Sequence, residues 1–209
     1  MNKVYKQQLL IKRFIDFIFS LLVIIFLHPL IIITIIIQTI ETRSFGVFTQ
    51  KRVGKNGKEF NIYKIRTMKN DSKITTNVTA RNDIRITKIG RFLRKSKIDE
   101  LPQFINVILG DMSIVGPRPD TPDFINKLPK KDKFFLKMKP GITGLSSIFL
   151  IDEEKLLENA KNPEEYNLKT IWPKKNSINK KYIDEWSILL DIKIIIKTMI
   201  LVLRRIMNK

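Results

Sequence analysis

The longest apolar run of the chain covers residues 17–37, FIFSLLVIIFLHPLIIITIII, and contains no Asp, Glu, Lys or Arg. At ~1.5 Å per residue, a straight helix of this length would reach across a ~30 Å hydrocarbon core. A cleavable signal peptide is the alternative, but its apolar region is usually only ~7 to 15 residues long, and no small-residue cleavage site follows this run. The pattern therefore predicts a helix that inserts into a membrane.

The middle of this run holds a histidine and a proline, His28 and Pro29. A proline inside a helix removes a backbone hydrogen bond and bends the helix, and a histidine is unfavourable at the centre of a bilayer. Both flanks of the run are basic, and positive flanks favour the cytoplasmic side of a membrane. On these patterns alone, a re-entrant hairpin with both ends on one side and a kinked span are equally consistent.

A second amphipathic pattern occupies residues 186–209. Its polar residues recur at spacings near four and seven and mark one stripe on an otherwise apolar helix: Ser187, Asp191, Thr198 and Arg205. Charges every few residues exclude a span, whereas a wide apolar face bordered by cations and a tryptophan is typical of a helix lying in the headgroup plane. An ordinary core helix is the alternative. The chain thus divides into a membrane element, residues 1–42, a soluble domain, residues 43–185, and an interfacial helix, residues 186–209, that belongs to the same domain.

Alternating apolar and polar residues on either side of GKNGK predict a β-hairpin, with strands over residues 46–53 and 58–66. A polar surface loop is expected over residues 69–82. The stretch IRITKIGRFLRKSK, residues 84–97, has the periodicity of a helix with one apolar and one cationic face, and LPQFINVILG, residues 101–110, predicts a second helix. We therefore expect an α/β fold, mostly helical, with a small β-hairpin region and no clean layered sheet.

The charge of the chain points to an anionic partner. Lys and Arg total 39 against 20 acids, which gives a formal net charge of +19 and a pI of about 10.1. A membrane surface, a nucleic acid and a phosphorylated substrate are all compatible with this excess. The chain has no cysteine, which excludes disulfides and thiolate metal sites.

Two neighbouring carboxylates, Asp99 and Glu100, stand in SKIDELPQF between the cationic stretch and the following helix. Ser96 or Asp99 could cap that helix, but a cap explains one acid and leaves Glu100 unexplained. Two carboxylates at a helix start could instead address one ligand, one by attacking phosphorus and the other by holding a metal ion. An anionic substrate would also require Mg²⁺ and nearby Arg or Lys to neutralise charge.

Two further segments carry residues suited to a ligand site. In GDMSIVGPRPD, Pro117 and Pro119 fix the backbone around Arg118, whose guanidinium could face a phosphate or stack on a nucleobase. An arginine in an ordinary surface turn is the alternative. The segment KPGITG, residues 139–144, predicts a tight loop close to a ligand or another backbone.

Together, these segments resemble the bacterial sugar transferases, the small monotopic phosphoglycosyl transferases. The resemblance covers nearly the whole chain and rests on these stretches: KRFIDF with the proline-interrupted apolar run, FTQKRVGKNGKEFNIYKIRTM, NDIRITKIGRFLRKSKIDELPQFINVILGDMSIVGPRPD, KPGITG and WSILLDIKI. It implies transfer of a phosphosugar from a UDP-sugar to undecaprenyl phosphate with release of UMP, Mg²⁺ as cofactor and a covalent aspartyl intermediate. The resemblance also implies that this transfer is the first membrane step of glycan biosynthesis.

The resemblance also implies roles for individual residues. Asp99 is similar to the family's nucleophile and Glu100 to its metal-binding partner, and both would lie at the Mg²⁺ site. The expected substrate-binding residues are Arg94, the strand-end residues Lys64, Arg66 and Thr67, the nucleotide motif Pro117, Arg118 and Pro119, and Arg85.

The membrane arrangement follows from the same resemblance. A break at His28 and Pro29 favours the re-entrant hairpin, with the enzyme monotopic in the bacterial inner membrane and its catalytic domain on the cytoplasmic face. The expected partners are the UDP-sugar donor, undecaprenyl phosphate and anionic membrane lipids, and no nucleic acid.

Some positions depart from the family pattern. His28 stands where the family commonly has serine, Ile84 where it has proline, and Asn179 where an acid often precedes Tyr182. The sequence LSSIFLIDEEKLL after Gly144 also differs from most relatives, and the altered loop could change which sugar is accepted.

Two other classes of function are compatible with part of the sequence. A membrane-tethered nucleic-acid binder would be expected to interleave aromatic residues with its cations, yet the cationic stretch offers only Phe92, on its apolar side. A noncatalytic membrane scaffold leaves the acid pair unexplained.

Overall fold

The computed structural model describes residues 3–69, 83–150, 156–157, 160 and 162–207. The described part of the fold is mostly helical with a small hairpin sheet, as the sequence predicts, and it contains a second small sheet that the sequence analysis did not predict. The expected loop at residues 69–82 lies almost wholly outside the described residues.

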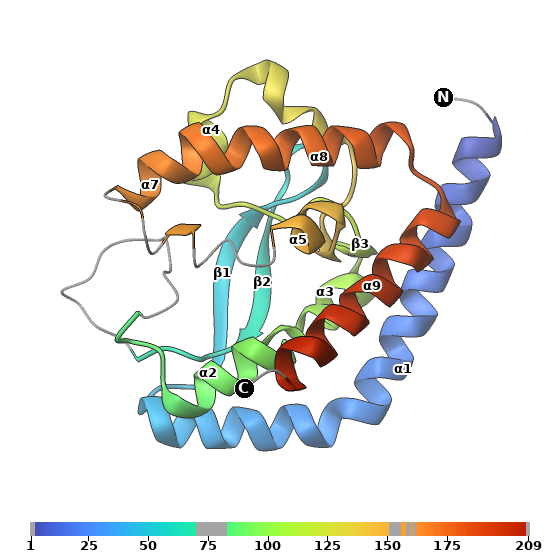
Figure 1. Cartoon of the computed structure of the whole chain (residues 1–209). Coiled ribbons are helices and arrows are strands. Elements are labelled where there is room, and N and C mark those ends of the chain that lie inside the picture. Colours follow the sequence, from blue (N-terminus) through green and yellow to red (C-terminus); the bar gives the residue numbers. More distant parts are fainter. Residues whose placement is uncertain (1–2, 70–82, 151–155, 158–159, 161, 208–209) are drawn as a thin grey trace.

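The first element is a single helix of 40 residues, α1 (Lys3–Thr42), which follows one side of the molecule and turns through one marked bend (Figure 1). Pro29 is the proline within it, and we attribute the bend to its missing N–H group. The carbonyl of Ile25 thereby loses its ordinary helical partner, and His28 replaces it, because His28 Nδ1 lies 2.7 Å from Ile25 O and donates to it. The histidine that departs from the family pattern thus satisfies the carbonyl that the proline leaves unpaired.

Helix α1 is the one described helix that is long and apolar enough to cross a membrane, over Gln7–Thr42. Many of its large apolar side chains are exposed in the folded chain, among them Phe14, Phe26, Ile33, Ile36 and Ile40. An exposed apolar surface of this kind is typical of a site that contacts a membrane or another protein. The predicted long apolar helix is confirmed, while its course through a bilayer stays a prediction.

The predicted hairpin is formed by β1 (Val47–Val53) and β2 (Glu59–Ile65), antiparallel, with Val47 opposite Ile65. The 3₁₀ turn η1 (Lys55–Gly57) connects them, and Asn56 and Gly57 have φ values of 58° and 80°. Asparagine and glycine accept this left-handed backbone most readily, which explains why the sequence signal is reliable here.

A second pair of strands, β3 (Ser113–Val115) and β4 (Gly141–Thr143), is parallel. The segment predicted as a tight loop at residues 139–144 therefore contains a short strand. The close backbone approach expected there is confirmed, because a Cβ atom on Gly141 would lie 2.1 Å from the backbone nitrogen of Gly116.

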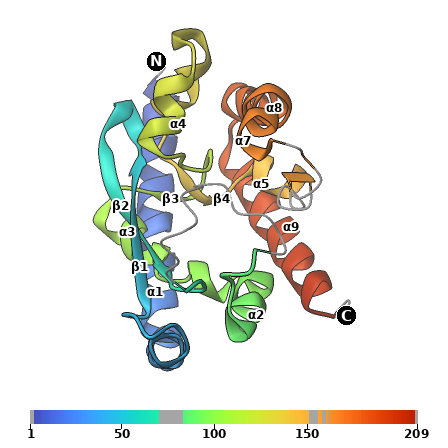
Figure 2. The ribbon, with the colours of Figure 1, turned by 90° about the vertical axis from the view of Figure 1, so that its left-hand side faces the viewer.

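The remaining helices surround these strands. The chain order is α2 (Lys88–Ser96), the 3₁₀ turn η2 (Ile98–Glu100), α3 (Gln103–Leu109), α4 (Pro122–Lys127), the 3₁₀ helix η3 (Lys130–Lys137), α5 (Leu145–Phe149), α7 (Pro163–Tyr166), the π-helix η4 (Asn167–Ile171), α8 (Trp172–Asp184) and α9 (Ile188–Met207). Figure 2 shows α1, the hairpin and α3 on one side, α8 and α9 on the other, and β3 and β4 between them. The main core gathers where these parts meet and includes Val107, Met112, Val115, Tyr182 and Ile194.

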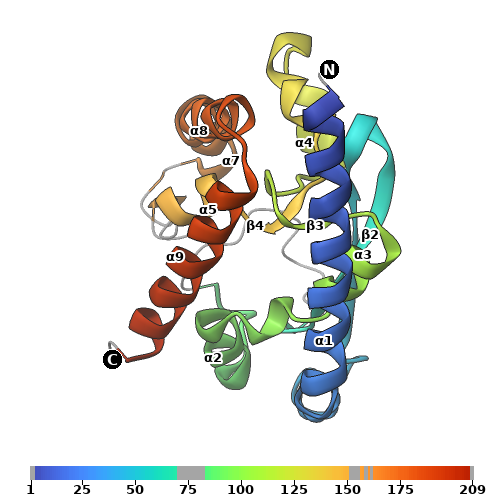
Figure 3. The same ribbon diagram turned by 90° about the vertical axis from the view of Figure 1, so that its right-hand side faces the viewer.

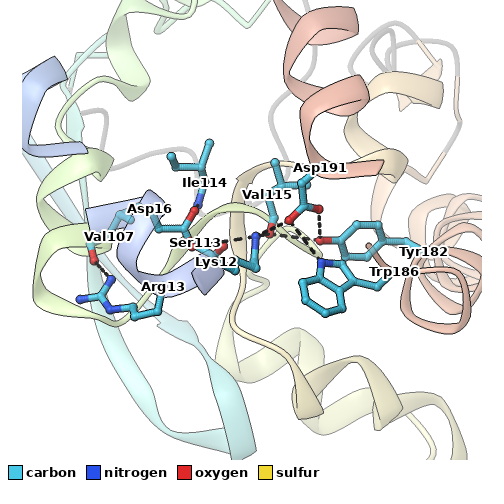
Figure 4. A network of polar contacts seen from close by, with 10 residues as sticks. All are labelled: Lys12, Arg13, Asp16, Val107, Ser113, Ile114, Val115, Tyr182, Trp186 and Asp191. Carbon is cyan, nitrogen blue, oxygen red and sulfur yellow. Dashed lines mark hydrogen bonds and ion pairs between the residues drawn. The ribbon is translucent and has the colours of Figure 1, made fainter. Parts of the chain in front are cut away.

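Helices α1 and α9 run past each other at an angle (Figure 3), and a polar network joins them to β3 (Figure 4). Lys12 of α1 donates to Asp191 Oδ2 of α9 at 2.6 Å and to the backbone oxygen of Val115 at 3.1 Å. Asp191 also accepts from Tyr182 at 2.8 Å and from Trp186 Nε1 at 3.2 Å. One buried carboxylate therefore holds three donors from α1, α8 and the segment before α9.

A second carboxylate strengthens the same junction. Asp16 of α1 accepts from Ser113 Oγ at 2.6 Å, and Arg13 Nη2 donates to the backbone oxygen of Ile108 at 2.9 Å near the end of α3. Buried polar contacts thus attach the inner side of α1 to the rest of the fold, while its outer surface is apolar.

The polar stripe of α9 faces inward. Asp191 is buried, and Thr198 Oγ1 lies 2.8 Å from Thr143 Oγ1 of β4. The opposite face exposes large apolar side chains: Leu189, Ile192, Ile196, Met199, Leu203 and Met207. The inward side also carries the core residue Ile194, so α9 has apolar side chains both in the core and on its exposed face, unlike an ordinary amphipathic core helix with a polar outer face.

Replacing Asp191 by alanine should destabilise the protein strongly, because Lys12, Tyr182 and Trp186 would lose their common acceptor. Breaking a buried ion pair of this kind typically costs about 3–5 kcal/mol. Thermal unfolding in detergent, followed by circular dichroism, measures the loss. Glu165→Ala is the matched control, since its partner Lys169 is exposed and such pairs contribute less than about 1 kcal/mol. Equal effects of the two changes would contradict the role given to Asp191.

Candidate active site

The two acids lie in η2, between α2 and α3, and both are buried. Helix α2 ends at Lys97, whose φ of 60° turns the chain sharply into η2. The predicted capping role is wrong for both candidates. Pro102 occupies the N-cap position of α3 without a side-chain cap, and Ser96 Oγ donates to the backbone oxygen of Phe92 within α2.

Glu100 is surrounded by cations. Its Oε1 atom lies 2.8 Å from Arg118 Nη2, 3.2 Å from Lys64 Nζ and 3.5 Å from Lys97 Nζ. Burial would raise the pKa of Glu100, but the charges of Arg118, Lys97 and Lys64 hold the pKa well below its usual value. Glu100 is therefore ionised throughout the physiological range.

Asp99 has a contrasting environment. Its Oδ1 atom is buried and has no hydrogen-bond partner among the described residues. Burial, and then the negative charge of Glu100, raise the pKa of Asp99 to about 6 against opposing effects of Lys64, Lys97 and Arg94. An unpartnered carboxylate oxygen that is ionised above about pH 6 is available as a nucleophile or a ligand.

Lys64 reaches the acids from the end of β2. Asn106 of α3 holds this strand in place, because its Nδ2 donates to Asn61 O at 2.8 Å and its Oδ1 accepts from Tyr63 N at 3.1 Å. Burial lowers the pKa of Lys64 to about 8, against the effect of the Glu100 charge. The lysine therefore carries its charge at neutral pH at a buried position beside two carboxylates.

Arg118 is presented by a clamped loop directly after β3. Gly141 N donates to Pro117 O at 2.9 Å, and Arg52 Nη1 donates to Pro119 O at 3.1 Å. At the end of the loop, Lys175 of α8 pairs with Asp120 at 3.1 Å. The backbone on both sides of Arg118 is thus fixed from β1, β4 and α8, while its side chain extends to Glu100.

The other predicted substrate-binding residues occupy varied positions. Arg94 lies close enough to lower the pKa of Asp99. Thr67 is buried, and its carbonyl accepts from Thr87 N at 3.0 Å. Arg66 donates to Phe45 O at 2.8 Å, and Arg85 pairs with Asp83 at 2.6 Å. Arg66 thus binds a backbone carbonyl, and Arg85 binds a carboxylate side chain.

Two cations of this region were missed by the sequence analysis. Lys97 contacts Glu100, and its spacing of three residues before that acid is the signal that could have identified it. Arg52 supports the Arg118 loop from β1 and carries no local sequence signal for that contact.

The acid pair suits a magnesium ion. The described residues contain no group of three or more His, Cys, Asp or Glu side chains that could enclose a metal. Mg²⁺ usually binds through one or two carboxylates and completes its octahedral shell with water and substrate phosphates. Asp99, with its unpartnered oxygen, and Glu100 provide such a partial set.

A family profile described as bacterial sugar transferase matches residues 7–205. The chain belongs to the bacterial sugar transferase family. The pair Asp99 and Glu100, with Lys64 and Arg118 around it, lies inside the matched region. Family membership thereby confirms the resemblance inferred from the sequence.

Several individual relatives are similar over most of this chain. A galactosyl transferase, CpsE, of Streptococcus agalactiae is 38% identical over 96% of this chain and 44% of its own length. A UDP-glucose:undecaprenyl-phosphate glucose-1-phosphate transferase of Klebsiella pneumoniae is 39% identical over 90% of this chain and 39% of its own length. A sugar transferase of Bacillus subtilis, EpsL, is 35% identical over 91% of this chain and 86% of its own length. The chain thus spans less than half the length of the first two relatives.

Asp99→Asn should stabilise the folded protein above about pH 6. The pKa of Asp99 is raised from 3.8 to about 6, so the folded state binds its proton more tightly than the unfolded chain, and stability falls as the pH rises through this interval. The difference corresponds to about 3 kcal/mol at neutral pH. Unfolding of both proteins in detergent between pH 4 and 8 measures it. A difference that stayed constant over this pH range would contradict the raised pKa.

Proposed function

We propose that this protein is a phosphoglycosyl transferase that moves a phosphosugar from a UDP-sugar to undecaprenyl phosphate and releases UMP. The observation that carries the proposal is the contrast within the acid pair. Asp99 presents a buried oxygen without a partner, while Glu100 beside it is held by Lys64, Lys97 and Arg118. The name of the Klebsiella pneumoniae relative, which states this class of transfer, supports the assignment.

The reaction proceeds in two displacements at the phosphorus atom bonded to the sugar. In the first, an oxygen of Asp99 bonds to this phosphorus, the bond from phosphorus to the bridging oxygen breaks, and UMP leaves with the electron pair. In the second, a phosphate oxygen of undecaprenyl phosphate attacks the same phosphorus. The Asp99 carboxylate departs, and the lipid carries the phosphosugar as a diphosphate.

The cations around the acids suit this chemistry, because the donor, the acceptor and the nucleophile are all anionic. Lys64 is partly buried beside the acids, where it would offset negative charge on the reacting phosphate. Arg118 would bind the nucleotide half of the donor, and Arg94 would face its phosphate. A Mg²⁺ ion held by Glu100 and Asp99 would supply further neutralisation of the donor diphosphate.

The membrane arrangement that we propose places this site at the cytoplasmic face of the bacterial inner membrane. The bend of α1 would return the helix to the side from which it entered, with its exposed apolar residues in the lipid. Helix α9 would lie in the headgroup plane with its apolar face in the lipid, and its bordering cations would attract anionic headgroups. A lipid acceptor and a water-soluble donor could then meet at one site.

Incubation of the enzyme with its UDP-sugar and Mg²⁺, without lipid, should release at most one UMP per enzyme. Asp99 is consumed in the first displacement and is restored only by the second. The Asp99→Asn protein should bind the donor and release no UMP. A panel of UDP-sugars, assayed for UMP and for added mass on the peptide that contains Asp99, tests this. A normal rate in Asp99→Asn would leave the chemistry to direct attack by the lipid phosphate.

Glu100→Gln should slow both half-reactions while it leaves the nucleophile in place. If Glu100 holds the metal ion, raising the Mg²⁺ concentration should recover part of the lost rate. Rates measured over a series of Mg²⁺ concentrations provide the check. A loss that no amount of Mg²⁺ reduces would argue against a metal-binding role.

The proposed re-entrant course of α1 can be tested with single cysteines, because the native chain contains none. Cysteines at Gln7 and at Thr49 should both react with a membrane-impermeant thiol reagent only when it reaches the cytoplasmic side. Pro29→Ala restores the missing N–H group, so it should straighten the helix and move part of the label at position 7 to the other side. Opposite accessibility of the two positions in the native background would exclude the hairpin.

A further inference from the structure

Glu100, the proposed metal ligand, is already occupied by the protein's own cations. Three positive side chains converge on one of its oxygens, and the shortest contact is the 2.8 Å bond from Arg118. Arg118 is also the residue expected to bind the donor. The guanidinium of Arg118 thus occupies the position where the metal ion would bind. The same group is also expected to bind the donor.

These two demands on Arg118 conflict. A magnesium ion binds a carboxylate oxygen at about 2.0–2.1 Å and requires a nearly ideal octahedral shell, which leaves little room for a guanidinium on that oxygen. The two cations also repel each other in a buried environment, where water screens charge weakly. A metal ion on the Oε1 atom of Glu100 therefore competes directly with Arg118.

Arg118 is the most suitable of the three cations to move. Lys64 has a side chain that is only 18% exposed, and it lies at the end of a strand whose position Asn106 fixes. The side chain of Lys97 is the most exposed of the three, at 40%, but it stands farthest from Glu100, at 3.5 Å, so its displacement would free less of the oxygen. The side chain of Arg118 is 33% exposed while its backbone is clamped on both sides, which allows the guanidinium to swing without any movement of the loop.

We propose that Arg118 and the divalent cation exchange at Glu100, and that this exchange couples metal binding to donor binding. In the donor-free enzyme, Arg118 is the partner of Glu100 and weakens metal binding there. When the nucleotide binds, it takes the guanidinium, and Glu100 becomes free for the metal. The inference rests on the proposed function, because it assumes a nucleotide diphosphate as the ligand of Arg118.

The exchange makes the two ligands cooperative. A nucleotide that removes Arg118 from Glu100 tightens metal binding, and the metal must tighten nucleotide binding by the same factor. Removal of Arg118 should therefore have opposite effects on the two ligands. It should strengthen metal binding in the absence of nucleotide and weaken nucleotide binding.

The test measures Mn²⁺ binding by electron paramagnetic resonance in detergent at pH 8, with and without UDP. Arg118→Ala should bind Mn²⁺ about tenfold more tightly than the native protein without UDP, on the order expected for loss of a charge-assisted contact. UDP should tighten Mn²⁺ binding in the native protein and have little effect in Arg118→Ala. Arg118→Gln also removes the charge but keeps a longer polar side chain, so it should behave like Arg118→Ala. It replaces the alanine variant if that variant folds poorly.

Two controls separate this exchange from other causes. Lys51→Ala removes the same charge from an exposed pair with Glu59, so an equal gain in Mn²⁺ affinity would reduce the effect to net charge and overturn the proposal. Glu100→Gln should lose the Mn²⁺ site, and retained affinity would place the metal elsewhere and also overturn it. Unchanged or weaker Mn²⁺ binding in Arg118→Ala without UDP would contradict the exchange directly. Failure of the proposed function would appear separately, as absence of UMP release by the native enzyme with every UDP-sugar.

Discussion

One carboxylate oxygen, Glu100 Oε1, fixes the arrangement of the site, because a buried negative charge requires positive partners at short range. Two of its three partners come from distant parts of the chain, Lys64 from the end of β2 and Arg118 from the loop after β3. The third, Lys97, lies only three residues before it, at the end of α2. The hairpin, the cationic helix and the parallel strands must therefore all be in place before Glu100 is satisfied. Asp99, one residue earlier, makes no ion pair of this kind, and the more distant charges of Lys64, Lys97 and Arg94 only partly offset its burial, so its pKa is raised.

The same strand connects the site to the apolar elements. Strand β3 ends at Val115, whose carbonyl accepts from Lys12 of α1, and the chain reaches Arg118 three residues later. Ser113 at the other end of β3 donates to Asp16 of α1. A long helix with an apolar outer surface is thus bonded to the strand that presents Arg118. If α1 lies in lipid and Arg118 binds the donor, as proposed, this connection would hold the donor site at a fixed distance from the lipid.

Local signals predicted the local parts of this structure well. The hairpin follows from alternation and from the Asn56 and Gly57 turn, and the long apolar helix with its bend follows from the apolar run that contains Pro29. The pairing of β3 with β4 was missed, because three-residue strands from distant segments leave no periodicity. The polar stripe of α9 was recognised, yet its partner Lys12 lies 179 residues earlier, and no spacing rule connects the two.

In the candidate site, too, local sequence signals predicted some residues, while others were missed or needed the family resemblance. The residues alone singled out Asp99, Glu100 and Arg118, and similarity to the family added Lys64 with the individual roles. Capping by Ser96 or Asp99 was a reasonable expectation that failed, since the left-handed Lys97 and the 3₁₀ turn separate the two helices. Lys97 was missed because it was read as part of the cationic helix.

The central claim is that Asp99 bonds to the phosphorus of the sugar phosphate before the lipid does. The stereochemistry at that phosphorus tests it most directly, with a UDP-sugar made chiral there by one sulfur atom and undecaprenyl phosphate as acceptor. Each in-line displacement inverts the configuration, so two displacements through Asp99 predict overall retention in the lipid product. Inversion would show a single direct transfer from donor to lipid and would contradict the account.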